Sequence, residues 1–156
     1  MTGSGAPVDR EVKIDARPET VWDLLTDERL AVRWMGLSAA YDMRPGGAYR
    51  VEVIPGRRAV GSFIEIDPPR RLVYTWGWDG DSRIPPGSTT VEFDLVADGE
   101  GTLLRLRHRD LPDHAAETTH ARGWEHYLSR LTMAAQGTDP GTDTWVADSP
   151  TSATEV

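Results

Sequence analysis

Between residues 39 and 109, apolar and polar side chains alternate in short runs that are separated by Gly, Pro and Asp. Successive residues of a strand point to opposite faces, so this pattern predicts antiparallel strands with one apolar and one polar face. The expected strands are AAYDM, AYRVEVI, AVGSFIEI, RRLVYTWGW, STTVEFDLVA and TLLRLRHR. The expected apolar face consists of Tyr49, Val51, Val53, Leu72, Tyr74, Trp76, Val91, Phe93, Leu95, Leu104, Leu106 and His108.

Segments on both sides of this meander complete the predicted fold. VDREVKID, at residues 8–15, alternates in the same way and predicts a further strand. Pro18 suits the first turn of a helix, and Asp27 is placed to cap a second short helix. Asp113 can cap a long helix over about 114–136. The apolar stripe of that long helix contains His120, Trp124, Tyr127, Leu128, Leu131 and Ala135.

The domain organisation follows from length and local composition. A chain of 156 residues fits one domain with a sizeable core. We expect this domain at residues 8–136, after a disordered N-terminus at 1–7. Residues 137–156 are rich in Gly, Pro, Ser, Thr and Asp and have no period, which predicts a flexible C-terminal tail. Trp145 is the exception in this tail, and it could dock onto the domain or cover the mouth of a pocket.

Charge and composition exclude several kinds of partner. A net charge of -8 argues against nucleic acid, because phosphate binding depends on Lys and Arg. No apolar run approaches the roughly 20 residues of a membrane helix, so membrane insertion is not expected. The N-terminal sequence MTGSGAPVD lacks the basic start and apolar segment of a secretory signal, which favours a cytoplasmic location.

Metal and cofactor sites are not expected either. The chain has no Cys, and His114, His120 and His126 recur every six residues, so that neighbouring imidazoles leave a helix in different directions. Neither a GxGxxG nor a GxxxxGK[ST] phosphate loop occurs, and no GxSxG motif supports a serine hydrolase.

Five stretches carry a resemblance to a known family. They are PETVWDLLTDERLAVRWMG, DMRPGGAYRVEV, GSFIEIDPPRRLVYTWGWDG, TTVEFDLVADGEGTLLRLRHRDLPD and HARGWEHYLSRL. Over residues 8–136, the chain resembles the family similar to the C-terminal domain of the Aha-type activator of a heat-shock chaperone ATPase, within the SRPBCC (START and pollen-allergen-like) superfamily. The resemblance implies an α+β helix-grip fold, in which a curved antiparallel sheet of order β-α-α-β6-α wraps a long C-terminal helix and leaves an internal cavity.

The same resemblance implies a range of functions. Cavities in this superfamily hold lipids, sterols, polyketides or hormones, some relatives are cyclases or hydrolases, and the eukaryotic domain assists a chaperone. The N-terminal activator domain is missing here, so a chaperone partner is not expected. The expected partner is a small hydrophobic molecule, and a homodimer stays open.

Aromatic residues on the expected inner surfaces form the candidate ligand-binding set. A core built only for packing would use Leu, Ile, Val and Phe, yet the chain has six Trp and two Phe. Trp78 follows a break in its strand and is expected at the rim. A packed core is the simpler alternative for the same side chains. The candidates are Trp34, Tyr41, Tyr49, Tyr74, Trp76, Trp78, His108, His120, Trp124 and Tyr127.

His108 and His120 are also the catalytic candidates, because burial would keep either imidazole neutral and able to act as a general base. The alternative for each is a structural hydrogen bond. Arg10 could contact a ligand oxygen or lie at the edge of the sheet. Alternation places Glu65 on the same face as Phe63, and we expect Glu65 to be solvated and paired with Arg71.

A glycine in the long helix and two arginine pairs are the remaining features that the sequence lets us interpret. Gly123, inside the long helix, either permits a close approach or leaves room beside the sheet. The arginine pairs at 57–58 and 70–71 flank turns and are interpreted as solubilising charges.

The leading functional hypothesis is the binding of a small lipophilic, aromatic or polyketide-like molecule between sheet and long helix. One alternative is a cavity enzyme of the cyclase, dehydratase or hydrolase type that uses a buried His. The other alternative is a chaperone-associated interaction module, which would expose a sizeable apolar patch.

Overall fold

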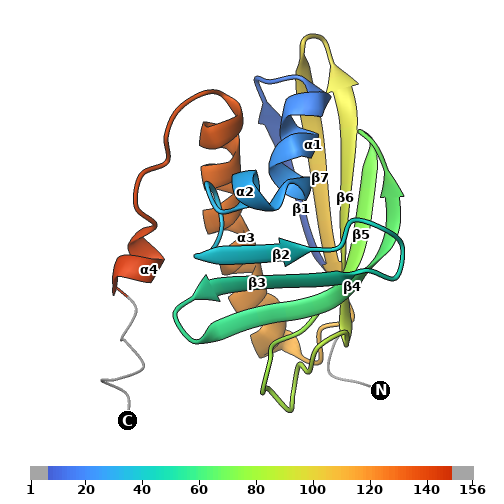
Figure 1. Cartoon of the computed structure of the whole chain (residues 1–156), viewed down its shortest axis with the longest axis vertical. Helices are drawn as coiled ribbons and strands as arrows, with labels where there is room; N and C mark the ends of the chain where they lie inside the picture. The colour runs from blue at the N-terminus through green and yellow to red at the C-terminus, as the bar shows by residue number, and fades with distance from the viewer. Residues whose placement is uncertain (1–6, 149–156) are drawn as a thin grey trace.

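Seven strands form one antiparallel sheet in the computed structural model, which describes residues 7–148. The strand order is β1-β7-β6-β5-β4-β3-β2, and three helices lie on the inner side of the curved sheet (Figure 1). The elements are β1 (Val8–Ile14), α1 (Pro18–Thr26), α2 (Glu28–Ala31), β2 (Ser38–Tyr41), β3 (Ala48–Ile54), β4 (Arg57–Asp67), β5 (Arg71–Trp76), β6 (Thr89–Asp98), β7 (Gly101–Arg109), α3 (His114–Ala135) and α4 (Thr144–Asp148). The predicted helix-grip order is confirmed.

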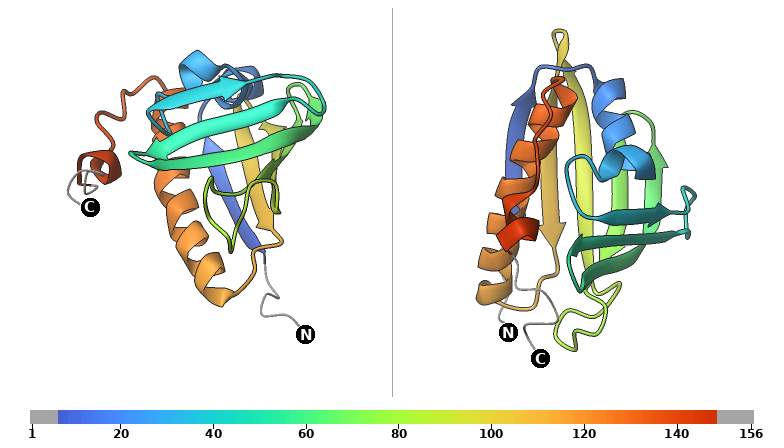
Figure 2. Two further views of the ribbon diagram at one scale, coloured as in Figure 1. Left: turned by 60° about the horizontal axis from the view of Figure 1, so that its bottom comes forward. Right: turned by 60° about the vertical axis from the view of Figure 1, so that its left-hand side comes forward.

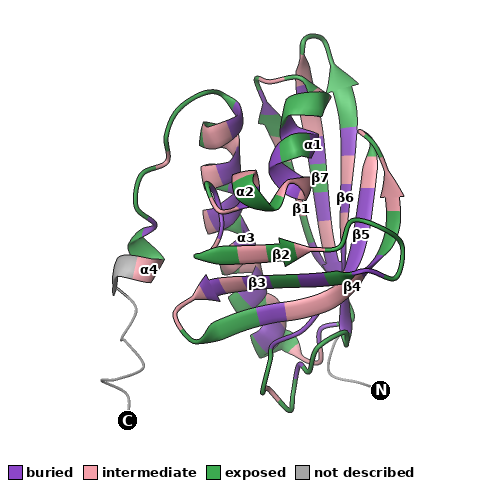
Figure 3. Ribbon diagram, viewed as in Figure 1, coloured by how far each residue is buried: buried purple, intermediate pink, exposed green. Residues whose placement is uncertain are grey.

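The two faces of the sheet separate as the alternation predicts. Every residue of the expected apolar face is buried, and the outward positions alternate with them (Figure 3). Ion pairs cross the outer face: Arg71 lies 2.8 Å from Asp94, and Arg105 lies 2.8 Å from Asp9. Arg10 forms an ion pair with Glu125 at 2.8 Å, which places it at the edge of the sheet.

A β-bulge in β4 corrects the predicted alternation. The pairing with β5 shifts between Phe63 and Glu65, so that Ile66, and not Glu65, returns to the inner side opposite Leu72. Phe63 is 1% exposed, whereas Ile64 is 51% exposed. The expected pairing of Glu65 with Arg71 is present at 3.1 Å. A bulge bends its strand, and β2 and β3, beyond β4, run transverse to β6 and β7 (Figure 1).

The helices are fixed by caps and by their buried faces. The side chain of Asp113 accepts a hydrogen bond from the Ala116 amide at 2.9 Å and starts α3, whose predicted apolar stripe is buried. Asp27 caps α2 through the Arg29 amide in the same way. The indole Nε1 of Trp34 donates to the Leu24 carbonyl at 2.8 Å and ties the segment after α2 to α1.

Residues 137–148 differ from the predicted flexible tail. This C-terminal segment turns back at Gly137, runs along α3 and ends in α4 (Figure 2). Arg130, on α3, donates to the Gly141 carbonyl of this segment at 3.0 Å. It also donates to the Trp34 carbonyl, in the chain after α2, at 3.0 Å, and so ties the segment to both α3 and that chain. A polar segment without a period can therefore be anchored by contacts that composition does not reveal. The rest of the predicted tail and residues 1–6 of the predicted disordered N-terminus lie outside the described residues.

Candidate functional site

A cavity of about 260 Å³ lies between α3 and the β3–β5 part of the sheet. Five of the ten candidate residues line it: Trp76, Trp78, His120, Trp124 and Tyr127. The remaining lining residues, which the sequence analysis did not assign to a site, are Met35, Val53, Ile54, Arg57, Thr119, Gly123 and Trp145.

Three tryptophans form the wall of this cavity. The ring centroid of Trp76 lies 5.2 Å from that of Trp78 and 5.5 Å from that of Trp124. All three indoles are buried. Within the described residues, the buried Nε1–H of Trp76 has no hydrogen-bond partner. An indole nitrogen can only donate, so one of the three tryptophans keeps an unused donor.

His108 lies behind the wall, where both of its ring nitrogens are used. Nε1 of Trp124 donates to Nδ1 of His108 at 3.0 Å, so Nδ1 must be the acceptor. The proton is therefore on Nε2, which donates to the Thr89 hydroxyl at 2.8 Å. Thr89 in turn donates to the Trp76 carbonyl at 2.7 Å. Four residues thus form a complete buried hydrogen-bond chain.

His120 has the opposite tautomer, for the same reason. Nε1 of Trp78 donates to Nε2 of His120 at 3.1 Å, and Nδ1–H of His120 donates to the Ala116 carbonyl at 2.8 Å. The rings of His108 and His120 meet edge to face, with centroids 5.1 Å apart. Each histidine is thus held by one tryptophan and one further polar group.

Both imidazoles are neutral at neutral pH. Burial lowers the pKa of His108 well below its usual value, and the nearby His120 lowers it further. Burial also lowers the pKa of His120, against a smaller raising effect of its bond to the Ala116 carbonyl. Neither ring has a free nitrogen to accept a substrate proton. The structural alternative thus accounts for both catalytic candidates.

The other candidates lie outside the cavity lining. Tyr41, Tyr49 and Tyr74 stack in sequence, with centroids 5.2 Å apart in the first pair and 4.1 Å in the second. Burial raises the pKa of each phenol, so all three are neutral. They fill the interior toward β2, as Trp34 does beside α1, and they act as core residues in this arrangement.

The C-terminal segment closes one side of the cavity through Asp143. The buried carboxylate of Asp143 accepts hydrogen bonds from Tyr127 Oη at 2.8 Å and from His126 Nε2 at 2.7 Å. Trp145, which lines the cavity, stacks on His126 with centroids 4.0 Å apart. Burial raises the pKa of Asp143, but these hydrogen bonds outweigh burial, and the pKa lies below its usual value.

Replacing Asp143 with Ala is expected to release this segment. The change removes the acceptor of two side-chain donors, which should lower the free energy of unfolding by about 1–2 kcal/mol. Hydrogen exchange of the amides at 138–146 should accelerate. Asp139→Ala is the matched control, because the side chain of Asp139 only accepts from the Gly141 amide at an exposed site. Equal exchange in both variants would show that Asp143 does not anchor the segment.

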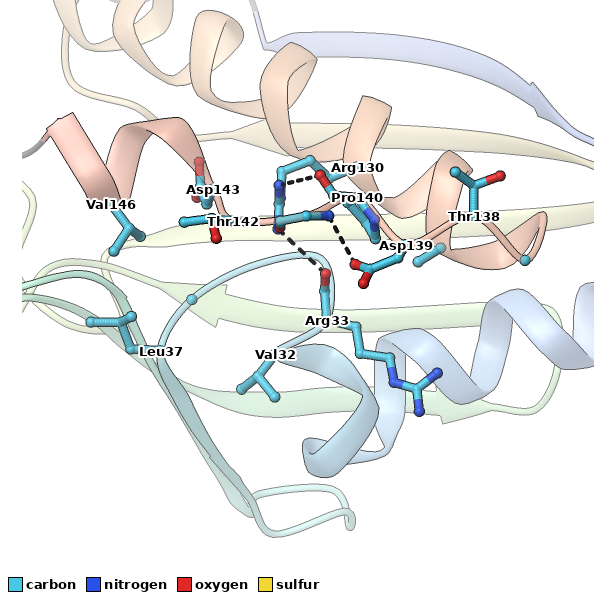
Figure 4. Close-up of a pocket in the computed structure, with 14 residues that line it drawn as sticks. Val32, Arg33, Leu37, Arg130, Thr138, Asp139, Pro140, Thr142, Asp143 and Val146 are labelled. Atoms are coloured by element: carbon cyan, nitrogen blue, oxygen red, sulfur yellow. Dashed lines mark hydrogen bonds between the residues drawn. The ribbon is translucent and has the colours of Figure 1, made fainter.

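A second hollow, of about 680 Å³, lies between α2 and the C-terminal segment (Figure 4). Arg130 crosses it and donates to the carbonyls of Arg33, Pro140 and Gly141. These bonds join the two sides of the hollow. Since its walls are largely loop backbone and polar side chains, and it lies outside the space between sheet and α3, the aromatic cavity is the better ligand site.

Membrane-spanning helices and clusters of metal ligands are both absent from the described residues. No helix at residues 7–148 is long and apolar enough to cross a membrane. The same residues hold no group of three or more His, Cys, Asp or Glu side chains arranged to bind a metal ion.

Three contributors to the cavity are absent from the predicted ligand-binding set, although covering a pocket mouth is one expected alternative for Trp145 and leaving room is one for Gly123. Arg57 was interpreted as a solubilising charge because it follows a turn, and its direction depends on the β3–β4 hairpin. Trp145 belongs to a segment without a period. Gly123 leaves room beside the sheet and does not serve a close approach, because a Cβ added there would meet no atom within 4 Å.

Comparisons with known proteins agree with this fold. The family model for Activator of Hsp90 ATPase homolog 1-like protein matches residues 15–136. The AHSA1-like protein of Rhizobium etli is 48% identical, with 88% of this chain and 86% of that chain covered and a TM-score of 0.72. CalU16 of Micromonospora echinospora is 31% identical, with 86% and 69% covered and a TM-score of 0.70. The Aha1 dimer of Colwellia psychrerythraea, at 16% identity, 85% and 98% coverage and a TM-score of 0.75, shares the fold. No curated protein matches the chain.

Proposed function

The chain belongs to the Activator of Hsp90 ATPase homolog 1-like family, and from this premise we propose that it binds a small lipophilic molecule in the cavity between the sheet and α3. The observation that carries the proposal is the aromatic wall with one unused donor, the Nε1–H of Trp76. A buried donor without a partner is unfavourable, and a ligand acceptor would relieve that cost.

The size and lining of the cavity support an apolar, ring-containing ligand. A volume of about 260 Å³ is close to the lower end of the roughly 300–1,000 Å³ found for small-molecule sites. Flat indole surfaces favour flat partners, through stacked and edge-to-face contacts. We infer a ligand of one or two fused rings with an oxygen acceptor, an aromatic or polyketide-like fragment being the simplest case.

Binding is better supported than catalysis. A general base needs a free acceptor nitrogen within hydrogen-bond reach of its substrate. The acceptor nitrogens of His108 and His120 are already bonded to Trp124 and Trp78. The enzyme alternative would require one of these bonds to break first.

The exposed hydrophobic side chains are scattered over the described part of the chain, which argues against the chaperone-associated interaction module. The large hydrophobic side chains exposed in the described part of the chain come from different elements: Leu37, Met43, Ile64, Val96, Met133 and Trp145. Isolated exposed apolar residues are ordinary on a protein surface.

Filling the cavity from Gly123 is the direct test. Gly123→Leu places a side chain into the open space beside the helix, and it should weaken binding of naphthalene-2-carboxamide by about 10- to 100-fold, since overpacking costs about 1–3 kcal/mol. Isothermal titration calorimetry measures the affinity. The variant should fold well, because replacing a glycine inside a helix removes a cost of about 1 kcal/mol.

Ala115→Leu is the matched control, since it adds the same side chain at an exposed position of the same helix. It should leave the affinity unchanged. No binding by the wild type, or equal affinity in wild type and Gly123→Leu, would contradict the proposed site.

A further inference from the structure

Among the residues that the structure describes, the cavity lining contains a single charged side chain, Arg57, and no carboxylate. Arg57 begins β4, after the turn that joins β3 to β4. Its guanidinium carbon lies 4.3 Å from the centroid of the Trp78 ring, and its side chain is 48% exposed. The cation therefore lies at the border between the aromatic wall and water.

Arg57 lies farther from its nearest carboxylate than the arginines on the outer face of the sheet do. The nearest carboxylate oxygen, Oδ2 of Asp81, lies 4.0 Å away. The other oxygen of Asp81 accepts from the amides of Arg83 and Ile84. Arg71 and Arg105, on the outer face, have carboxylates at 2.8 Å. Among the described residues, the guanidinium of Arg57 donates no hydrogen bond, so its five N–H groups remain available.

The remaining lining favours an anion over a cation. Trp76 offers a donor, and the acceptor nitrogen of His120 is used by Trp78. An ammonium group in this cavity would find no carboxylate and would face the positive charge of Arg57. A carboxylate, in contrast, matches the planar fork of a guanidinium, and that of Arg57 lies over an indole ring.

We propose that the natural ligand is a flat apolar acid, whose ring system lies against Trp76, Trp78 and Trp124 and whose carboxylate lies at the mouth against Arg57. This inference rests on the proposed function and adds the charge and orientation of the ligand. The ion pair would be half-exposed, so it adds selectivity more than affinity: a preference of about 5- to 20-fold over the neutral amide.

The test compares three probes that share one ring system: naphthalene-2-carboxylate, naphthalene-2-carboxamide and 2-(aminomethyl)naphthalene. Calorimetric titration of the full chain at pH 7.5 and low salt should rank the carboxylate first, the amide about 5- to 20-fold weaker, and the amine weakest. In Arg57→Gln the carboxylate and the amide should bind with equal affinity.

Arg58→Gln is the matched control. Arg58 is the next residue, is 46% exposed, pairs with Asp79 at 3.4 Å and does not line the cavity. Removing this charge should keep the preference for the carboxylate. A preference that Arg58→Gln abolishes as fully as Arg57→Gln would reflect net charge and overturn the assignment to Arg57.

The same titrations separate two questions: whether the cavity binds the probes at all, and whether Arg57 selects the acid among them. If wild type binds all three probes equally and Gly123→Leu weakens all three, the cavity binds lipophilic molecules but Arg57 does not select acids. If wild type binds none of them, both proposals fail. The order of the three affinities is measured on the wild type alone. The inference therefore stays testable even if Arg57→Gln folds poorly.

Discussion

Replacing His108 with Ala is expected to lower the free energy of unfolding by about 3–5 kcal/mol. The side chain is 0% exposed, so its removal leaves a void in the core. The change also removes the acceptor of Trp124 Nε1–H and the donor to the Thr89 hydroxyl, which keeps its own bond to the Trp76 carbonyl. The indole loses its acceptor altogether, and an unpaired buried polar group costs about 1–3 kcal/mol.

Urea unfolding followed by tryptophan fluorescence at pH 7.5 measures this loss. His114→Ala is the control, because the His114 side chain is 90% exposed at the start of α3, and its loss should cost less than about 0.5 kcal/mol. A loss below 1 kcal/mol in His108→Ala would mean that the buried chain from Trp124 to the Trp76 carbonyl contributes little.

The protein is expected to lose stability as the pH falls below about 6.5. The folded-state pKa values of His108 and His120 lie below the ordinary value, because burial disfavours their charged forms. The unfolded chain therefore binds protons first as the pH falls, which favours unfolding. At pH 5.5, one unit below the ordinary pKa of His, each histidine that stays neutral in the folded state costs about 1.4 kcal/mol. The loss is therefore at most about 3 kcal/mol, and His108, whose pKa is lowered further than that of His120, contributes the larger part.

Unfolding titrations between pH 7.5 and pH 5.5 check this dependence. His120→Gln removes one of the two groups but keeps a side chain that can accept from Trp78 and donate to the Ala116 carbonyl. The loss over this interval should then shrink by at most about 1.4 kcal/mol. Constant stability of the wild type over the interval would show that the buried histidines do not set its acid sensitivity.

The fold could be predicted in detail because its determinants are periodic. Strand alternation and the stripe on α3 both result from burial of one face, and both are visible in a single sequence. The exception is β4, where a bulge adds one residue and reverses the direction of Glu65 and Ile66. A bulge leaves no periodic signal, so alternation places Glu65 on the face of Phe63, although its expected pairing with Arg71 is confirmed.

The site was predicted only in part because its assignment depends on distances between elements. Alternation placed Trp76 and Tyr74 on the same face, yet only Trp76 reaches the cavity. Tyr74 instead stacks on Tyr49 in the core. Arg57 reaches the cavity because of the geometry of the β3–β4 hairpin. Trp145 reaches it because the carboxylate of Asp143 anchors the chain just before α4. Neither position is set by local periodicity.

The pairing of each buried histidine with a tryptophan also affects how broad the ligand range can be. An indole has one N–H group, and those of Trp78 and Trp124 are already bonded to imidazole nitrogens. Under the proposed function, a ligand would meet these two rings through their carbon surfaces, and among the described residues Trp76 is the one member of the wall whose N–H group has no partner. Such a wall would discriminate by shape and tolerate differences in the position of substituents. The histidines would therefore make the cavity permissive toward a series of related flat molecules, while they hold two of its three indole rings in place.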